Sequence, residues 1–438
     1  MKKLLSIFLT LFVFTLNVQA KSSKGDFASI IKDSGISKDS IAISVRNADN
    51  GKVVYSLNDK IMMNPASIQK VLTMTSALDA LGEDYKFKTE LYLKGEDIYL
   101  IKLSGDPYLR YNDLKFLTKP VRGGAKQIYI DDSVLDDNCW GAGWQWDDDM
   151  NVLMPRFGAY NLDSNLIKLI LSPSESGQFA KISNPSKYPL VFLNNITTSN
   201  ITKLDIKRDS AVSDNTLKLG GTIARQTTVN IPSNNLKRYF EIRLTQALGE
   251  NRIYLKTPFL PQKLTSEYTI QESFEHGIDV ALNDILKNSN NMSAETVFKL
   301  SGGDGTVEKA IQKFNEFCES KKLDSSVIKI TDGSGVSKNN LVTADFVSDF
   351  LYRNSESPVM TYLPTPGQGT LVQRMLPIKE NLRAKTGTLV NISSIAGYLT
   401  TKKGNNYTFC IIQNDVKLSS AEKKILEEYI IREAYLKL

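Results

Sequence analysis

The most constraining feature of this sequence is its pattern of strand-like and helical segments, which changes twice along the chain. Residues 26–84 contain strand-like and helical segments, whereas residues 85–262 are mostly short strand-like runs separated by Asn, Ser, Gly and Pro. Residues 263–438 return to longer helices and strands. A β-rich stretch between two mixed stretches predicts an insertion into one domain. We therefore expect an α/β chain of the α+β type, whose two ends form one antiparallel sheet flanked by helices.

Turn and helix-end signals define the elements before the insertion. Asn50-Gly51 separates two β-rich runs and predicts a hairpin. A helix is expected from about Pro65 to Gly82, because Pro favours a first helical turn and Gly favours a C-terminal stop.

After the insertion, helical texture resumes near residue 271, which would place His276 at the start of an amphipathic helix. Two strands with a turn near Gly404-Asn405 are expected next. An amphipathic helix over 420–438 then ends the sequence. The first and last helices are expected to pack on the shared sheet.

The first residues predict a segment that directs export. "MKKLLSIFLTLFVFTLNVQA" has a Lys pair, an apolar run from Leu4 to Leu16 and, at Val18-Gln19-Ala20, the small residues that a signal peptidase site requires. These features are typical of a secretory signal peptide cleaved after Ala20, and the apolar run is too short to span a bilayer comfortably. No later segment is apolar enough to cross a membrane, so we expect an exported, periplasmic protein with no transmembrane segment in its mature chain.

These signals divide the chain into four parts. We expect a signal peptide at 1–20, one domain built from 21–84 and 263–438, and inserted β-rich domains at 85–262. Within the insert, residues 176–232 are expected to form an inner domain.

Composition excludes several classes of function. The formal net charge is +6, but no basic block is interleaved with aromatics, so no nucleic-acid partner is expected. The single histidine, His276, excludes a multi-histidine metal site. Cys139, Cys318 and Cys410 lack metal-ligand spacing and are too few for a disulfide scaffold, although one long-range bridge stays open. We therefore expect no metal and no cofactor.

A serine and a lysine three residues apart open the first predicted helix, in "NPASIQK". Ser67 and Lys70 would lie on one helix face about a turn apart, so their side chains can touch. A serine becomes nucleophilic when a base takes its proton, and a lysine can be that base if burial or a second cation lowers its pKa. The same spacing recurs where a solvated lysine is an adequate explanation: Ser29/Lys32, Ser326/Lys329 and Ser420/Lys423.

Lys-Thr-Gly occurs once, in the strand-like run "AKTGT". Lys385 on a strand edge could hold a substrate carboxylate, and Gly387 would let a substrate approach the backbone. The backbone N–H of Thr388 could complete an oxyanion-binding pair with that of Ser67. The competing explanation is a strand with a surface lysine and a glycine bulge.

Ser-x-Asn is the third motif, and four of its copies are considered. Residues 213–215 lie inside the β-rich insert, 233–235 at its apparent boundary, and 337–339 further along the chain. We select Ser289-Asn290-Asn291, which separates two predicted helices in the part that returns to the first domain. An Asn there can contact Lys70 and a substrate amide. For any single copy, a helix-capping loop is the alternative.

The three motifs together are much more specific than each alone. Their combination resembles the penicillin-binding protein and serine β-lactamase superfamily. Within it, the chain resembles the low-molecular-mass class C group, the D-alanyl-D-alanine carboxypeptidase/endopeptidase family of peptidoglycan enzymes (peptidase family S13). The narrower resemblance is carried by "NPASIQKVLT", "LSGDPYL", "IYIDDSVLD", "GWQWDDDM", "KNSNNMSAETVFK", "ITDGSGVSKNNLVT", "LPTPGQGTLVQRM" and "AKTGTLVNISSIAGYLTT".

This resemblance covers most of the mature chain and is weakest at about 176–232. It implies the serine β-lactamase/penicillin-binding fold, an antiparallel sheet flanked by helices, with inserted β-rich domains. One departure is "PGQGT", where the family often has an acidic residue before Gly-Thr; no catalytic group is affected.

The resemblance also implies roles for the catalytic residues. Ser67 attacks the carbonyl between two D-alanines, or between D-alanine and a cross-linked diamino acid, and Lys70 is the general base. Ser289 relays a proton to the leaving amine, and Asn291 positions the substrate. Lys385 holds the terminal carboxylate or tunes Ser289.

Substrate-binding residues follow from the same resemblance. Thr386 shares the contact with the carboxylate, Gly387 allows close approach, and the N–H of Thr388 contributes to the oxyanion hole. In the acidic "WDDDM" loop, Asp148 is expected to recognise a free amine of the stem peptide, with Asp147 as the near alternative. A solvated acidic loop is the competing explanation.

The implied partners are peptidoglycan stem peptides, with β-lactam antibiotics as covalent inhibitors; the oligomeric state stays open. Two other functions stay open as well. A β-lactamase would share the motifs, but the Glu-x-x-Leu-Asn loop of class A enzymes is not found. A non-catalytic penicillin-binding or scaffolding module would bind penicillin without releasing D-alanine.

Overall fold

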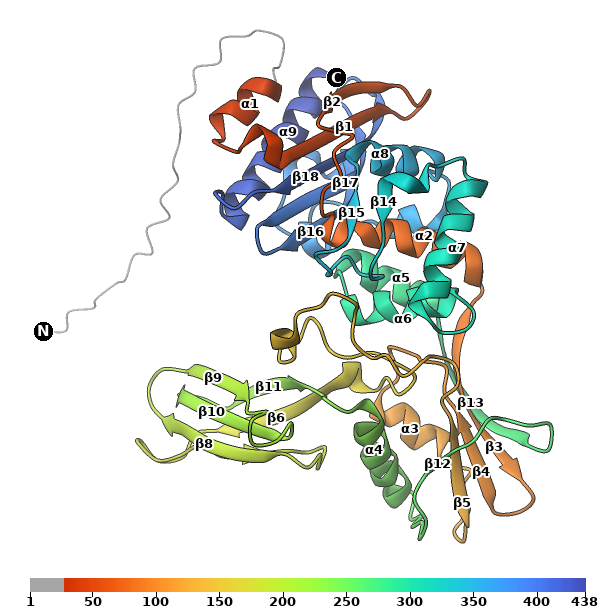
Figure 1. Cartoon of the computed structure of the whole chain (residues 1–438). Helices are drawn as coiled ribbons and strands as arrows, with labels where there is room; N and C mark the ends of the chain where they lie inside the picture. Colours follow the sequence, from red (N-terminus) through yellow and green to blue (C-terminus); the bar gives the residue numbers. More distant parts are fainter. Residues whose placement is uncertain (1–26) are drawn as a thin grey trace, which may run out of the picture.

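The computed structural model describes residues 27–438, so the predicted signal peptide lies outside the described residues. The molecule is elongated, with both ends of the described chain in its upper half and the insert in its lower half (Figure 1). The α-helices are α1 (Phe27–Asp33), α2 (Gln69–Leu81), α3 (Tyr111–Leu117), α4 (Leu236–Glu250), α5 (Ile278–Lys287), α6 (Asn291–Ser301), α7 (Val307–Ser320), α8 (Ala344–Arg353) and α9 (Ser420–Lys437).

The strands of the upper half are β1 (Ile41–Asn47), β2 (Val53–Leu57), β14 (Ile328–Lys329), β15 (Leu341–Val342), β16 (Leu382–Leu389), β17 (Ile392–Thr400) and β18 (Asn406–Asn414). Those of the lower half are β3 (Lys86–Lys94), β4 (Ile98–Lys102), β5 (Gln127–Asp131), β6 (Leu166–Ser172), β7 (Lys181–Ser183), β8 (Val191–Thr198), β9 (Lys203–Arg208), β10 (Thr216–Ile223), β11 (Thr227–Pro232), β12 (Leu260–Pro261) and β13 (Thr269–Gly277).

Both ends of the chain form one antiparallel sheet, in the order β16-β17-β18-β1-β2. Alternate residues of β1 enter different cores: Ile41 and Ile43 pack with α1 and α9, whereas Ala42 packs with α8 and the buried helices beyond it. This alternation follows from the two-residue period of a strand. The predicted sheet, its hairpin at Asn50-Gly51 and its flanking first and last helices are therefore confirmed.

α2 is the central helix of the upper half. Every residue from Gln69 to Leu78 is buried, and its largest contact is with α6. The helix ends where predicted, because Gly82 adopts φ +87° and its N–H bonds to the carbonyl of Leu78. Such a rigid, buried helix is a precise support for the side chains at its start.

The lower half contains three sheets, ordered β12-β5-β4-β3-β13, β8-β10-β9 and β11-β6-β7. β13 begins beyond residue 262 and pairs with β3, so the first of these sheets includes residues on the C-terminal side of the predicted boundary. The prediction of a β-rich insert omitted α4, a helix that starts with Asn235 accepting a hydrogen bond from the N–H of Arg238.

The prediction for His276 is wrong. Residues 269–277 form β13, and the helix begins at Ile278, so His276 lies in a strand opposite Phe87. Its Nδ1 is 2.7 Å from the buried Asp106 carboxylate, which raises the histidine pKa, chiefly through this hydrogen bond. Pairing with β3 outweighed the helical pattern of the sequence that follows.

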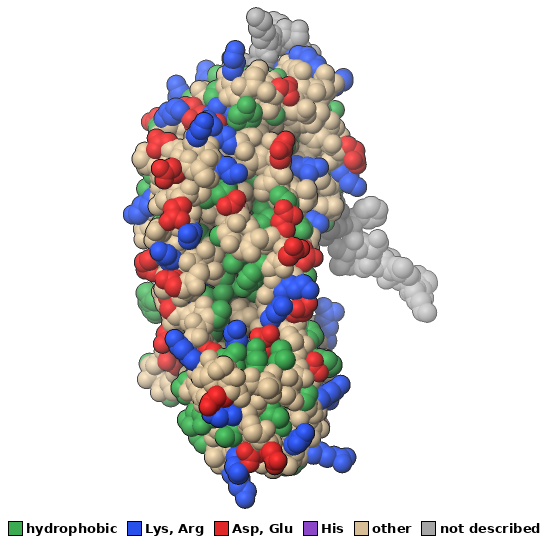
Figure 2. Space-filling view, turned by 90° about the vertical axis from the view of Figure 1, so that its right-hand side faces the viewer, with side chains coloured by type: hydrophobic (Ala, Val, Ile, Leu, Met, Phe, Trp, Pro, Cys, Tyr) green, Lys and Arg blue, Asp and Glu red, His purple; other side chains and the backbone are tan. Residues whose placement is uncertain are grey.

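Acidic and basic side chains are interspersed over the face of the molecule that Figure 2 shows. That face therefore presents no broad area of one sign. Across residues 27–438, no helix combines the length and the apolar character that a membrane span requires.

Candidate active site

The start of α2 and the short helix before it bring Ser67 and Lys70 together. A short 3-10 helix, Ala66–Ile68, precedes α2, and Ala66 adopts φ +48° with its N–H bound to the side chain of Asn64. Lys70 Nζ lies 2.9 Å from Ser67 Oγ. Ser67 is 9% exposed and Lys70 is fully buried, so the contact is shielded from water.

Lys70 has two further partners that fix its amine. Its Nζ donates to Asn291 Oδ1 at 2.7 Å and to the Ser334 carbonyl at 2.6 Å. Burial lowers the Lys70 pKa to about 7, although the charges of Asp332 and Glu295 oppose the shift. An amine with this pKa is often neutral near neutral pH and can then accept a proton from the serine.

Two buried carboxylates that the sequence analysis gave no role support this amine. Glu295 accepts from the N–H groups of Gly333 and Ser334, which holds the turn whose carbonyl contacts Lys70. Asp332 accepts from Trp144 Nε1 at 2.8 Å and from two N–H groups of the same turn. Burial, and then the charge of Asp332, raises the Glu295 pKa.

On β16, Lys385 is fully buried and points to the second serine. Its Nζ lies 2.9 Å from Ser289 Oγ and 2.8 Å from the Thr386 carbonyl. Burial and the charge of Lys70 hold the Lys385 pKa well below its ordinary value. Thr386 Oγ1 donates to Thr370 Oγ1 at 2.7 Å.

Gly387 lies where β16 passes the start of α2. A Cβ atom at this position would be 2.8 Å from the Ser67 nitrogen and 2.9 Å from the Pro65 carbonyl oxygen. Only glycine therefore permits this approach, which places the strand beside the N–H of Ser67. Thr388 follows on the strand and lines the same cavity as Ser67.

Residues 288–290, here called the Ser289 loop, join α5 to α6. Ser289 adopts φ +63°, a left-handed conformation that costs a non-glycine residue about 1–2 kcal/mol. Asn291 starts α6; its Oδ1 accepts from Lys70, and its Nδ2 donates to the Leu153 carbonyl at 2.8 Å. The selected Ser-x-Asn copy thus contacts both lysines.

A cavity of about 270 Å³ opens at Ser67 and is lined also by Asn291, Thr388 and residues of the acidic loop. Of the loop aspartates, Asp148 lines the cavity and Asp147 does not. Asp149 instead pairs with Arg208 at 2.8 Å. The remaining lining residues are Gly143, Trp144, Gln145, Asn151, Leu153, Met154, Val336, Lys338, Leu389 and Val390.

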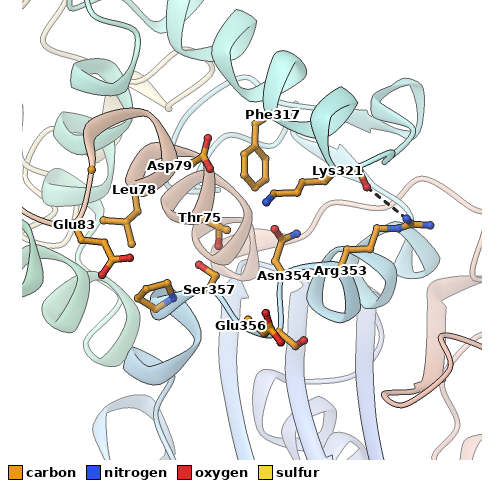
Figure 3. Close-up of a pocket in the computed structure, with 13 residues that line it drawn as sticks. Thr75, Leu78, Asp79, Glu83, Phe317, Lys321, Arg353, Asn354, Glu356 and Ser357 are labelled. Carbon is orange, nitrogen blue, oxygen red and sulfur yellow. Dashed lines mark hydrogen bonds between the residues drawn. The ribbon is translucent and has the colours of Figure 1, made fainter.

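A separate cavity of about 530 Å³ lies at the opposite end of α2 (Figure 3). Thr75, Asp79 and Glu83 line it together with side chains from α7 and from the chain after α8. None of the predicted site residues contributes to it. Ser67 opens into the smaller cavity, and Lys70 contacts both Ser67 and Asn291 beside it, so we place the candidate site there.

Two other copies of Ser-x-x-Lys have ordinary structural contacts. Ser29 Oγ donates to Asp33 on α1, and Lys423 on α9 donates to the Asn391 carbonyl. Cys139, Cys318 and Cys410 are free thiols. In the described part of the chain, no group of three or more His, Cys, Asp or Glu side chains is arranged to hold a metal ion.

Comparison with known proteins gives a consistent picture. Residues 23–433 match the model of the D-Ala-D-Ala carboxypeptidase 3 (S13) family. The chain is 25% identical to a D-alanyl-D-alanine carboxypeptidase of an Actinomadura species, over 89% of this chain and 80% of that protein. It is also 25% identical to D-alanyl-D-alanine carboxypeptidase DacB of Haemophilus influenzae, over 97% and 96% of the respective chains.

The fold is similar to that of a solved structure. The crystal structure of penicillin binding protein 4 from Haemophilus influenzae matches with a TM-score of 0.82 and 21% identity, and covers 94% of this chain and 99% of that one. The predicted penicillin-binding fold is confirmed by this likeness.

Proposed function

The chain belongs to the D-Ala-D-Ala carboxypeptidase 3 (S13) family, and we propose that it is a serine D-Ala-D-Ala carboxypeptidase acting on peptidoglycan stem peptides. The observation that carries this proposal is the buried Lys70 amine, 2.9 Å from Ser67 Oγ, with its pKa lowered to about 7. A neutral amine in hydrogen-bond contact with a hydroxyl is the arrangement that a serine nucleophile requires.

In the first step, Ser67 Oγ attacks the carbonyl carbon of the penultimate D-alanine while its proton moves to Lys70 Nζ. The negative charge that develops on the carbonyl oxygen is stabilised by the N–H groups of Ser67 and Thr388. The close approach of β16 at Gly387 supports this pairing, because it brings the strand beside the Ser67 nitrogen.

The carbon–nitrogen bond then breaks, and the departing amine needs a proton. Ser289 Oγ supplies it, and the proton that Lys70 took from Ser67 replaces it, so Lys70 is neutral again before the second step. The 2.9 Å contact between Ser289 Oγ and Lys385 Nζ supports the role of Ser289 as proton donor. Asn291 contacts Lys70 and the loop at Leu153, which favours a role in orienting the substrate amide. The product of this half of the reaction is an acyl-enzyme ester on Ser67 and free D-alanine.

Water completes the cycle by attacking the ester carbonyl, with Lys70 again taking a proton and Ser67 leaving with one. A β-lactam ring would acylate Ser67 by the same attack. Its leaving nitrogen stays tethered to the acyl group, so we expect slow release and inhibition by penicillins.

Two contacts define the ends of the substrate. Lys385 and Thr386 are proposed to bind the terminal carboxylate, and Asp148 the free amine of the stem peptide, because it lines the Ser67 cavity. Asp148→Ala should reduce cleavage of a free-amine peptide more than that of its amidated analogue. An unchanged ratio between the two peptides would remove Asp148 from the binding site.

We also propose DD-endopeptidase activity on cross-linked peptides and export to the periplasm after cleavage at Ala20. Incubation with purified cross-linked muropeptides tests the first, and the absence of monomeric products would refute it. The N-terminal residue of the protein recovered from cells tests the second, and a chain still starting at Met1 would contradict cleavage.

The decisive test of the proposed function is D-alanine release. A peptide ending in D-Ala-D-Ala should lose one D-alanine with wild-type protein and none with Ser67→Ala. Wild-type protein that is acylated by penicillin yet releases no D-alanine would overturn the carboxypeptidase proposal and favour a non-catalytic penicillin-binding module.

A further inference from the structure

The strained residue Ser289 lies between two asparagines that bind one carboxylate. Asn288 Nδ2 donates to Asp284 Oδ1 at 2.8 Å, and Asn290 Nδ2 donates to Asp284 Oδ2 at 2.7 Å. Both neighbours of Ser289 are thus attached to the same side chain. Asn290 also caps α6 by accepting from the Ser293 N–H.

A third donor reaches Asp284 from the lower half of the molecule. Tyr108 Oη donates to Asp284 Oδ2 at 3.1 Å, and the Tyr108 N–H is bound to Asp106 at 2.8 Å. Asp106 in turn contacts His276 on β13. The Asp284 carboxylate therefore joins the Ser289 loop to the segment that follows β4.

The position of Asp284 on its helix is unfavourable for the helix itself. Asp284 lies in the last turn of α5, where the helix dipole is negative and a carboxylate destabilises. A lysine, arginine or neutral residue would suit this turn better. The presence of a carboxylate at this position is therefore explained by the three hydrogen-bond donors that it accepts from, and not by any benefit to the helix.

We propose that Asp284 is a positioning residue that holds Ser289 in its left-handed conformation, with its hydroxyl on Lys385. The proposal rests on the proposed function, in which Ser289 hands a proton to the leaving amine. Without Asp284, the two asparagines lose their common acceptor and the loop can relax toward the less strained right-handed region. Ser289 Oγ would then leave Lys385, whereas Ser67 and Lys70, held by α2, would stay in place.

This mechanism makes a prediction that general destabilisation does not. An amide substrate needs a proton on its leaving nitrogen, but a thioester substrate with the same acyl group expels a thiolate without one. We expect Asp284→Ala to lower kcat/KM for the D-Ala-D-Ala peptide by about tenfold or more, a partial loss of general-acid catalysis. Hydrolysis of the matched thioester should change much less, so the amide-to-thioester ratio falls.

Asp279→Asn is the matched control, because Asp279 is an exposed acidic residue in the first turn of the same helix. It should leave the amide-to-thioester ratio unchanged. Tyr108→Phe removes one of the three donors to Asp284 and should lower the ratio to a smaller extent. This variant keeps the proposal testable if Asp284→Ala does not fold.

Equal losses on amide and thioester in Asp284→Ala, or no loss on either, would overturn the positioning role. Failure of the proposed function has a different signature. Wild-type protein that leaves the peptide intact but reacts with benzylpenicillin refutes the carboxypeptidase proposal alone. The rate at which benzylpenicillin acylates Asp284→Ala, expected to fall in the same way, then decides on the positioning role of Asp284. Wild-type protein inert to both compounds overturns both proposals.

Discussion

The two serines of the candidate site are held by different means. Ser67 lies in the 3-10 helix that precedes α2 and Lys70 in the first turn of α2, where backbone hydrogen bonds of this buried segment fix their separation. Ser289 lies in a partly exposed loop with φ +63°, and side chains from other elements hold it there. The comparison separates a proposed nucleophile at the start of a buried helix from a proposed proton donor whose position depends on its neighbours.

The difference has a consequence for how changes act. A substitution far from the helix start can displace Ser289 without moving Ser67, because the two side chains are held by different contacts: Ser289 Oγ bonds to Lys385, and Ser67 Oγ bonds to Lys70. Changes to Ser67 or Lys70 should abolish acylation directly. Changes around the Ser289 loop should instead lower the acylation rate to the extent that Ser289 is displaced.

The largest effect should come from removing the base. Lys70→Met keeps the volume of the side chain but leaves Ser67 without a proton acceptor, so acylation by benzylpenicillin should slow by about a thousandfold. Stopped-flow or quenched-flow measurement of penicilloyl formation gives the rate.

A matched control lies elsewhere in the chain. Lys423 has the same Ser-x-x-Lys spacing, is 1% exposed and donates to the Asn391 carbonyl. Lys423→Met should lower stability but leave the acylation rate of folded protein unchanged. Equal slowing in both variants would mean that burial of a lysine, and not its role as base, explains the loss.

The next largest effect should come from Gly387→Ala. The added Cβ would be 2.8 Å from the Ser67 nitrogen, so β16 and the start of α2 must separate. A displacement of this kind should slow acylation about a hundredfold. Gly123→Ala, at a site with nothing within 4 Å of a Cβ, serves as the control. A normal rate in Gly387→Ala would show that the close approach has no part in acylation.

The smallest predicted effect is the dependence on pH. Because only neutral Lys70 can accept the serine proton, the acylation rate should fall about tenfold for each pH unit below the Lys70 pKa of about 7. The rate should rise through this value and reach a plateau above it. Asp284→Ala should lower the plateau without moving the midpoint, since Asp284 is not among the charges that shift the Lys70 pKa. A pH midpoint that shifts in Asp284→Ala would mean that the Ser289 loop also affects Lys70, so that the two serines are not held independently.

Much of the fold could be predicted from local signals. Asn50-Gly51 forms a turn and Gly82 ends a helix because of their own backbone preferences, so the sequence alone predicts both positions. His276 was misplaced because pairing of β13 with β3 joins segments far apart in the chain. α4 was missed although Leu236, Tyr239, Phe240 and Leu244 are buried at helical spacing.

The site residues also fall into two groups, those that short motifs predict and those that depend on tertiary contacts. Ser67, Lys70 and Lys385 belong to short motifs with a chemical reason for each residue type, and the structure brings their side chains to one place. Glu295 and Asp332 act through the turn at 333–337, which hydrogen bonds from side chains of α6 and α2 hold beside Lys70. A buried carboxylate has no sequence pattern of its own, so these residues could not be assigned.

The most direct test of the account is the intact mass of purified protein lacking residues 1–20 after incubation with excess benzylpenicillin, beside Ser67→Ala. The account predicts one stable benzylpenicilloyl group on the wild-type protein and none on the variant. An adduct on both proteins, or none on well-folded wild-type protein, would contradict the central claim that Lys70 activates Ser67 as a nucleophile.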